Sequence, residues 1–190
     1  MREITRINPT YSTTRTLTLQ KPVIKKQVED KFETFLFLPE GEARQGEGGL
    51  RTQGCFKKSF DDKPLISIVT VVYNGEAFLE ETILSVINQA YDNVEYIIID
   101  GGSTDRTIDI IKKYEDKLDY WISESDDGIY DAMNKGIDLV TGEWVNFVNS
   151  SDVLNGNAYT VILDCLVKNS NKCDVIAFGY PPVSGYMSAQ

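Results

Sequence analysis

From Pro64 onward, the chain alternates between two hydrophobic patterns. Almost wholly apolar segments rich in Val and Ile are typical of strands that are buried on both faces, and they occupy residues 65–74, 94–100, 119–123, 143–149 and 174–179. Segments in which apolar residues recur every three or four positions predict amphipathic helices, and they occupy residues 76–89, 103–114, 128–140 and 157–169. The alternation predicts an α/β fold with a mainly parallel, Rossmann-like sheet and helices on both faces.

Residues 1–63 show no strong hydrophobic period. The stretch GEARQGEGGLRTQG, residues 41–54, is rich in glycine and charge, so we expect a loop there. The sequence therefore predicts two parts: an irregular N-terminal extension at residues 1–63 and one α/β domain at residues 64–190.

Charge is distributed unevenly between these parts. Residues 1–63 carry 12 Lys and Arg against 9 Asp and Glu, whereas residues 64–190 carry 7 against 20. The acidic part is a poor candidate for nucleic-acid binding because it would repel phosphates. A dianionic ligand there would need a cation or helix N-termini to hold it. The basic extension is a candidate for peripheral contact with an anionic membrane face, and a solvated arm is the favoured alternative.

The rest of the composition limits which side chains can act as a base or metal ligand, and it indicates the cell compartment. The chain has no histidine, so any general base or metal ligand must come from other side chains. Its 3 cysteines form no metal-type pair and fit reduced thiols in a cytosol. The longest apolar run, LISIVTVVY, is less than half of a membrane span, and the N-terminus lacks the apolar core of a signal peptide. We therefore expect a cytoplasmic protein, and the inner face of the membrane is the one surface that it is a candidate to contact peripherally.

Polar residues follow the predicted strands at the points where ligands bind in parallel sheets. These strand ends are Tyr73-Asn74, the DGGSTD segment at residues 100–105, Ser123-Glu124 and the NSSD segment at residues 149–152. DGGSTD lacks the spacing of the G-x-G-x-x-G dinucleotide fingerprint. Its Asp100 either accepts hydrogen bonds from a base or ribose or belongs to an ordinary turn. Ser103 or Thr104 is the expected N-cap of the helix that follows.

Several motifs occur together in a fixed order: SIVTVVYN, SVINQAY, VEYIIIDGGSTDRT, ESDDGIYDAMNKGI and TGEWVNFVNSSD. Over residues 64–179 the chain resembles the nucleotide-sugar-binding half of a family 2 glycosyltransferase with the GT-A fold. The segment GIYDAMNKG resembles bacterial members that build surface polysaccharides. The resemblance implies an enzyme that transfers a sugar, with inversion, from a nucleoside-diphosphate donor to a saccharide or lipid-linked acceptor.

The resemblance also implies which residues bind the donor. The second acid of the family pattern D-D-G-S-x-D, which reads the uracil edge in some members, is Gly101 here, so the base is left open. We expect Asp105 to support the helix N-terminus rather than touch ligand. Lys135 is expected to face the diphosphate, with a solvent-facing lysine as the alternative. The full expected donor site is Thr70, Tyr73, Asn74, Asp100, Glu124, Asp126, Asp131, Asn134 and Lys135.

The metal motif of the family departs from its usual form. A D-x-D-D pattern normally holds Mg²⁺ or Mn²⁺, and here the positions are Asn149, Ser150, Ser151 and Asp152. Asn149, Ser151 and Asp152 still offer the oxygen ligands that Mg²⁺ accepts when phosphates supply the rest. We expect Mg²⁺ or Mn²⁺ to bind through these residues, weakly without nucleotide. The alternative role of Asp152 is to cap the helix that follows.

An inverting transferase also needs a general base to deprotonate the acceptor. In the family this base is an acid well downstream of the metal motif, and neither Asp164 nor Asp174 is placed like it. The catalytic base is therefore expected to lie outside this chain. The alternative function is a non-catalytic, nucleotide-sugar-binding fragment without the acceptor half. A nicotinamide-type dinucleotide binder fits the sheet but not the glycine spacing.

Overall fold

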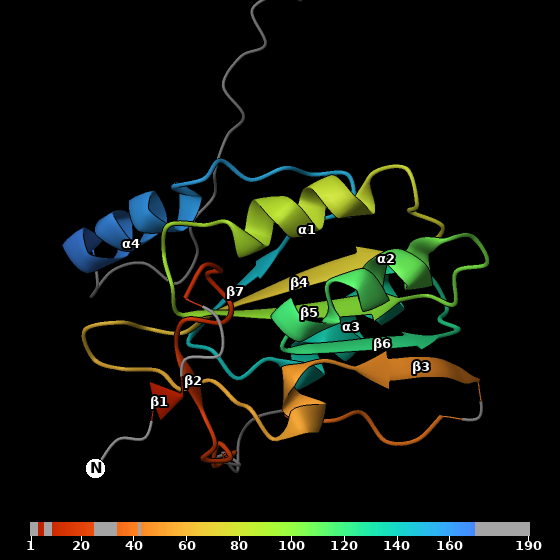
Figure 1. Ribbon diagram of the computed structural model, residues 1–190, viewed down its shortest axis with the longest axis horizontal. Coiled ribbons are helices and arrows are strands. Elements are labelled where there is room, and N and C mark those ends of the chain that lie inside the picture. The colour runs from red at the N-terminus through yellow and green to blue at the C-terminus, as the bar shows by residue number, and fades with distance from the viewer. Residues whose placement is uncertain (1–3, 6–8, 25–33, 42, 170–190) are drawn as a thin grey trace, which may run out of the picture.

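The computed structural model describes residues 4–5, 9–24, 34–41 and 43–169, and a five-stranded sheet lies at its centre (Figure 1). The strand order is β3-β6-β5-β4-β7, and only the β3–β6 pair is antiparallel. The strands span Arg44–Gly48 (β3), Ile66–Val72 (β4), Val94–Asp100 (β5), Tyr120–Glu124 (β6) and Trp144–Phe147 (β7). The mainly parallel α/β sheet predicted from the sequence is confirmed. The predicted strand at residues 174–179 lies outside the described residues.

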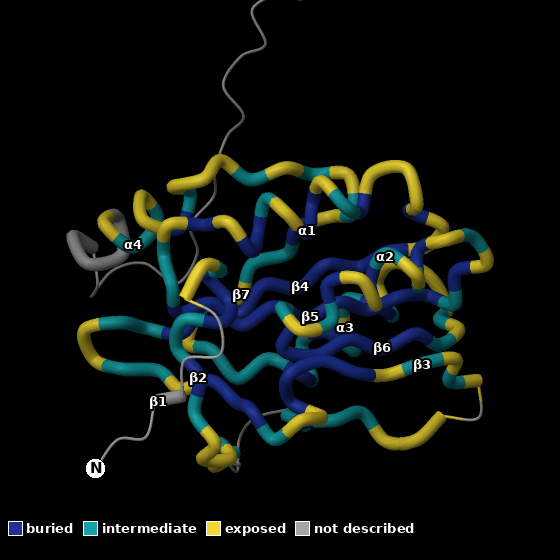
Figure 2. The backbone as a smooth tube through the Cα atoms, viewed as in Figure 1, coloured by how far each residue is buried: buried dark blue, intermediate teal, exposed yellow. Residues whose placement is uncertain are grey.

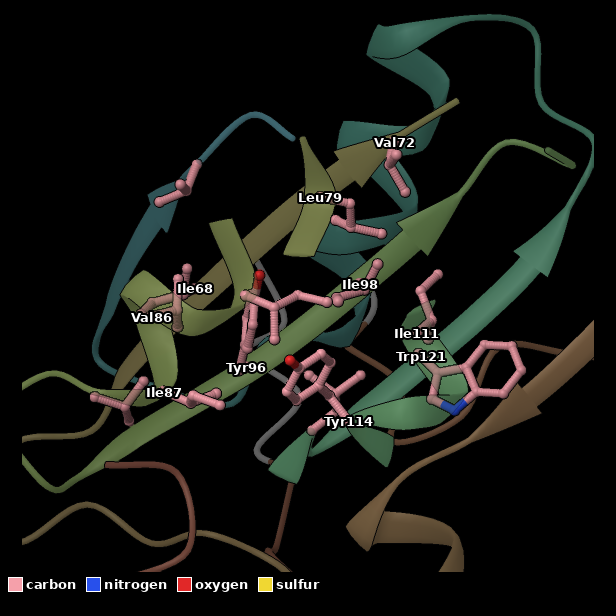
Figure 3. Packing of buried hydrophobic residues seen from close by; sticks show 14 of the residues in the cluster. Ile68, Val72, Leu79, Val86, Ile87, Tyr96, Ile98, Ile111, Tyr114 and Trp121 are labelled. Carbon is pink, nitrogen blue, oxygen red and sulfur yellow. The ribbon is translucent and has the colours of Figure 1, made fainter. Parts of the chain in front are cut away.

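Helices cover both faces of this sheet (Figure 1). They span Leu79–Ile87 (α1), Thr107–Lys113 (α2), Ile129–Leu139 (α3) and Ala158–Asn169 (α4), with 3₁₀ turns at Leu50–Gln53 (η1) and Glu115–Lys117 (η2). Ile68 and Ile98 share one core with Leu79 and Ile111 of α1 and α2 (Figure 3). The alternate residues, such as Val69 and Ile97, join Ala132 and Leu139 of α3 in a second core. Because successive strand side chains point to opposite faces, strands that are buried at every position, as β4 and β5 are, require cover on both sides.

The connections reverse direction at β4. The chain passes from β4 through α1 to β5 and through α2 to β6, and then returns through α3 to β7 on the other side of β4. In such sheets the loops separate at the reversal point and leave a crevice beyond the carboxyl ends of the strands. The fold therefore places a crevice at the ends of β4, β5 and β7.

The prediction of a loop over residues 41–54 is wrong for Arg44–Gly48, which form the edge strand β3. A Cβ atom on Gly46 would lie 2.8 Å from Cη2 of Trp121, and one on Gly48 would lie 2.6 Å from its indole nitrogen. The glycines thus let β3 cross directly over the Trp121 ring. Glycine reads as a loop signal in sequence, but in strands it also marks a close approach of this kind.

Further segments of the N-terminal part also have regular structure. Ile4–Thr5 (β1) and Leu17–Thr18 (β2) form a small antiparallel pair, and η1 carries the buried residues Leu50 and Arg51. Figure 2 shows burial continuing from the central strands into η1. Parts of residues 1–63 therefore share a sheet and a core with the segment that starts at Pro64, where the sequence suggests a boundary.

The start of α2 differs from the sequence prediction. The helix begins at Thr107, and neither Ser103 nor Thr104 is its N-cap. Asp105 instead accepts a hydrogen bond from the Thr107 backbone N–H at 2.9 Å and another from the Glu76 N–H at 3.0 Å. The predicted support of this helix end by Asp105 is confirmed. Among the described residues, no helix has both the length and the hydropathy needed to cross a bilayer.

Candidate active site

A cleft of about 790 Å³ opens beyond the carboxyl ends of the central strands. Its wall is formed by the end of β4 (Val71, Val72, Tyr73), the loop after β5 (Gly101, Gly102), the segment from β6 into α3 (Ser125, Asp126, Gly128, Ile129, Ala132), the loop after β7 (Asn149, Ser150, Ser151) and Gln45 of β3. Of these residues, Asp126 is the only one with a carboxylate, and there is no lysine or arginine. The cleft lies where the reversal of strand order predicts it.

Hydrogen bonds hold the loops after β4 and β5 together at the base of the cleft. The Asn74 N–H donates to the Ser103 hydroxyl at 2.7 Å, and the Asn74 side-chain oxygen accepts from the Thr104 N–H at 2.9 Å. Asn74 has a φ of 50°, in the left-handed region that Asn tolerates better than most residues. Asn74 thus joins the two loops, while Tyr73 beside it is 65% exposed and contributes to the cleft wall.

Two predicted donor ligands lie below the cleft rather than in its wall. Asp100 is fully buried, and its carboxylate accepts hydrogen bonds from the Ser103 N–H and from the hydroxyls of Ser103 and Ser123. Thr70 is also fully buried, with its hydroxyl 3.0 Å from that of Tyr96. Asp100 therefore fixes the loop that carries Gly101 and Gly102, and Thr70 packs in the interior of β4.

Glu124, Asp131 and Lys135 form an ion-pair cluster beside the cleft. The Lys135 ammonium lies 3.1 Å from Glu124 Oε1 and 3.2 Å from Asp131 Oδ2, and it donates to the Ser125 carbonyl. Glu124 also accepts from Arg44 of β3, at 3.2 Å. Burial lowers the pKa of Lys135, but its bonds to Glu124 and Asp131 outweigh that effect and raise it overall. The lysine therefore keeps its charge and is held by two carboxylates.

The donor residues predicted on α3, Asp131, Asn134 and Lys135, are not among those that form the cleft wall. Ile129 and Ala132 contribute to the cleft wall, whereas Asn134 is exposed on the helix surface. The turn that precedes the helix contributes Asp126, whose Oδ1 accepts a hydrogen bond from the Gly128 N–H at 2.9 Å. Gly128 has a φ of 109°, a conformation that favours glycine, so this turn is built to hold Asp126 at the cleft.

The segment Asn149–Asp152 carries the candidate metal ligands. Asn149 and Ser151 lie in the cleft wall, and Asp152 Oδ2 accepts from the backbone and side-chain amides of Asn149, at 3.3 and 3.2 Å. Because the Asn149 amide nitrogen faces Asp152, its oxygen faces away and remains suited to a hard cation. Within the described ranges, no three His, Cys, Asp or Glu side chains form a metal-binding group. This donor set fits a cation that takes most of its ligands from a diphosphate.

Gln45 is a cleft residue that sequence reasoning missed. It comes from β3, and its side-chain nitrogen lies 3.3 Å from the position of a Cβ atom on Gly102. Nothing in residues 1–50 signals a role, because the position of Gln45 depends on the pairing of β3 with β6.

A doubly wound sheet whose cleft is walled by strand-end glycines and polar loops defines an α/β protein of the nucleotide-binding class. Residues 67–185 match the family described as glycosyl transferase family 2, which amounts to more than half of the chain. The chain belongs to this family, and it carries a transferase fold of the kind that the sequence resemblance implied.

Relatives with curated descriptions agree with this assignment. The chain is 37% identical over 109 residues to an uncharacterized glycosyltransferase of Haemophilus influenzae, covering 56% of this chain and 44% of that protein. It is also 37% identical over 94 residues to a PGL/p-HBAD biosynthesis glycosyltransferase of Mycobacterium bovis, covering 48% and 37%. The chain thus spans less than half of the length of these two relatives.

Solved structures of Staphylococcus aureus TarS share the fold. TarS 1–349 matches with a TM-score of 0.51 and 25% identity, over 56% of this chain and 33% of that chain. The same protein in complex with UDP-GlcNAc matches with a TM-score of 0.52 and 23% identity, over 60% and 37%. These likenesses agree with the predicted GT-A type of α/β fold.

Proposed function

We propose that this chain binds a nucleoside-diphosphate sugar in the cleft and forms the donor-binding half of a glycosyltransferase. The observation that carries this proposal is the position of the cleft, beyond the ends of β4, β5 and β7, with the loop residues Gly101 and Gly102 in its wall. Open, mainly parallel sheets of this kind bind ligands in the crevice at the point where the strand order reverses. The family membership and the UDP-GlcNAc complex of TarS support the same ligand class.

The donor would lie along the cleft with its diphosphate near the loop after β7. Asn149, Ser151 and Asp152 would hold Mg²⁺ or Mn²⁺ there. Such an ion clamps the diphosphate and offsets the charge that develops on the leaving group. Tyr73 would contact the nucleoside from the wall of the cleft, and Asn74 and Asp100 would position the loops that receive it.

The cluster of Glu124, Asp131 and Lys135 would border the diphosphate or the sugar. A lysine already paired with two carboxylates contributes little net positive charge, so we assign it mainly to orienting these acids beside the cleft. Asn134 would contact only a ligand part that extends over the outer surface of α3.

Transfer with inversion to a saccharide or lipid-linked acceptor is the reaction that we propose for the whole protein. An acid must then deprotonate the attacking hydroxyl. A second candidate, donor binding without transfer by this chain, is favoured by the described part of the cleft wall, in which Asp126 supplies the one carboxylate. We further propose a cytoplasmic location, with the basic N-terminal part as the surface for any contact with an anionic membrane face.

Calorimetric titration of the chain with UDP, GDP, CDP and ADP, with and without Mn²⁺, tests the proposal. We expect at least one nucleotide to bind, and more tightly with Mn²⁺. If none of the four binds under either condition, donor binding is disproved. Release of labelled sugar to an acceptor, measured for this chain and for a longer form that extends past Gln190, separates transfer from binding alone.

A further inference from the structure

The Asp126 carboxylate lies directly over Gly101. A Cβ atom on Gly101 would lie 2.4 Å from Oδ2 and 3.0 Å from Cγ of Asp126, closer than non-bonded atoms approach. Asp126 therefore occupies the space that a side chain at position 101 would fill. The acid is supplied by the segment after β6, and the glycine after β5 leaves room for it.

One oxygen of this carboxylate is available to a ligand. Oδ1 accepts the Gly128 N–H, which closes the turn into α3. Within the described part of the chain, Oδ2 has no hydrogen-bond donor, and Asp126 forms no ion pair. An ionised carboxylate only accepts hydrogen bonds, so Oδ2 can accept one from an N–H or O–H of whatever enters the cleft.

Gln45 belongs to the same cleft wall as Asp126, and its side chain is of the complementary kind. Its Nε2 lies 3.3 Å from the Cβ position of Gly102, which is also 3.3 Å from the Ser125 backbone nitrogen. An amide group donates as well as accepts. The neighbouring glycines thus lie under an acceptor from Asp126 and a donor from Gln45, while Arg44 and Glu124 fix β3 to β6 next to them.

We propose that Asp126 and Gln45 read the base of the bound nucleotide above Gly101 and Gly102, which deepens and rests on the proposed function. The pair selects bases that carry a ring N–H beside a carbonyl oxygen, as uracil, thymine and guanine do. The ring N–H donates to Asp126 in a charge-assisted hydrogen bond, and the carbonyl oxygen accepts from Gln45. Adenine and cytosine offer a ring nitrogen lone pair at the same edge, which the carboxylate repels.

Calorimetry with UDP, GDP, CDP and ADP tests the selection. For the unaltered chain we expect UDP or GDP to bind about tenfold or more tightly than CDP and ADP, the usual effect of one charge-assisted hydrogen bond. Asp126→Asn keeps an oxygen for the Gly128 N–H but removes the charge, and it should lower the affinity for the preferred nucleotide by about tenfold. Asp127→Asn, at the neighbouring exposed acid outside the cleft wall, is the matched control and should leave binding unchanged.

An exchange of the two positions separates base reading from loop support. Gly101→Asp alone places a second side chain on Asp126 and should abolish tight binding. The double variant Gly101→Asp/Asp126→Gly returns one carboxylate to the same space, and binding of the preferred nucleotide should recover. Gln45→Glu replaces the hydrogen-bond donor by an acceptor, so it should weaken binding of the preferred nucleotide more than Gln45→Ala does. Thermal melting of each variant shows whether it remains folded.

Three results would overturn the inference. The first is equal affinity of the unaltered chain for all four nucleotides. The second is unchanged affinity of folded Asp126→Asn, and the third is a double variant that folds without recovery of binding. These outcomes leave donor binding itself intact, whereas an unaltered chain that binds no nucleotide defeats the proposed function and this inference together.

Discussion

Arg51 and Glu95 form a fully buried ion pair, with 2.6 Å between Nη2 and Oε1, that joins the N-terminal part of the chain to β5 in the middle of the sheet. Arg51 also donates to the carbonyls of Leu36 and Leu139, and Glu95 accepts from Ser67. Burial alone would raise the pKa of Glu95, but the Arg51 charge and the hydrogen bonds of Ser67 and Thr141 lower it overall. The pair is therefore charged, and both partners make further hydrogen bonds in the interior.

Arg51→Met should destabilise the fold strongly. It leaves the Glu95 carboxylate buried without its partner, and breaking a buried pair from one side costs about 3–5 kcal/mol. Chemical denaturation measures the loss in the free energy of unfolding. Lys63→Met is the control, because the Lys63–Asp92 pair is partly exposed and such pairs contribute about 0–1 kcal/mol. Equal losses in the two variants would mean that the buried pair has no special role.

Asp119 should make stability depend on pH. Its side chain is fully buried, Oδ2 accepts from the Tyr96 N–H, and Oδ1 has no hydrogen-bond partner among the described residues. Burial raises the pKa of Asp119 to about 7, against the opposing charge of Lys57. Since this exceeds the unfolded pKa of about 3.9, the stabilising contribution is complete below pH 3.9 and is lost as the pH rises to about 7.

Asp119→Asn removes this titration and keeps an acceptor for Tyr96. Its stability relative to the unaltered chain should therefore improve between pH 5 and pH 8, by on the order of 2–4 kcal/mol at about 1.36 kcal/mol per pKa unit. Asp116→Asn, at an exposed position, should show no such trend. Parallel stability curves of Asp119→Asn and the unaltered chain over this range would contradict the assignment.

Gly136 sets how closely α3 packs on β4. A Cβ atom there would lie 2.5 Å from Cγ1 of Val69. We expect Gly136→Ala to lower the free energy of unfolding by about 1–3 kcal/mol through overpacking, and Val69→Ala in the same chain to relieve part of that loss. Gly156→Ala is the control, since nothing lies within 4 Å of its Cβ position. A Gly136→Ala variant as stable as Gly156→Ala would show that the helix shifts freely.

Asp152→Ala should remove the dependence of nucleotide binding on metal. Asp152 supplies the one carboxylate of the Asn149–Asp152 segment, and a divalent ion needs at least one anionic protein ligand beside the diphosphate. The expected result in calorimetry is the same nucleotide affinity with and without Mn²⁺. Asp164→Ala, at an exposed position of α4, should keep the Mn²⁺ effect. Persistence of the effect in Asp152→Ala would exclude Asp152 as a metal ligand.

The parallel sheet and the position of the cleft followed from the sequence by itself. The apolar β-branched runs in β4 and β5 and the amphipathic patterns of α1 and α3 are local signals, and the chain order of strands and helices limits how they can assemble. Polar residues at strand ends such as Tyr73, Asp126 and Asn149 could be expected near the cleft, because the carboxyl ends of parallel strands share one edge.

Only the tertiary structure decided which of these side chains reach the cleft. Asp100 is hydrogen-bonded to Ser103 and Ser123 below the cleft, whereas Asp126 lies over Gly101 in the cleft wall. Gln45 belongs to the edge strand β3, whose glycines led to the prediction of a loop. Hydrophobic period and residue type report on neighbours a few positions apart. The directions of these side chains depend on hydrogen bonds and close contacts between segments that are 20 to 80 residues apart in the chain.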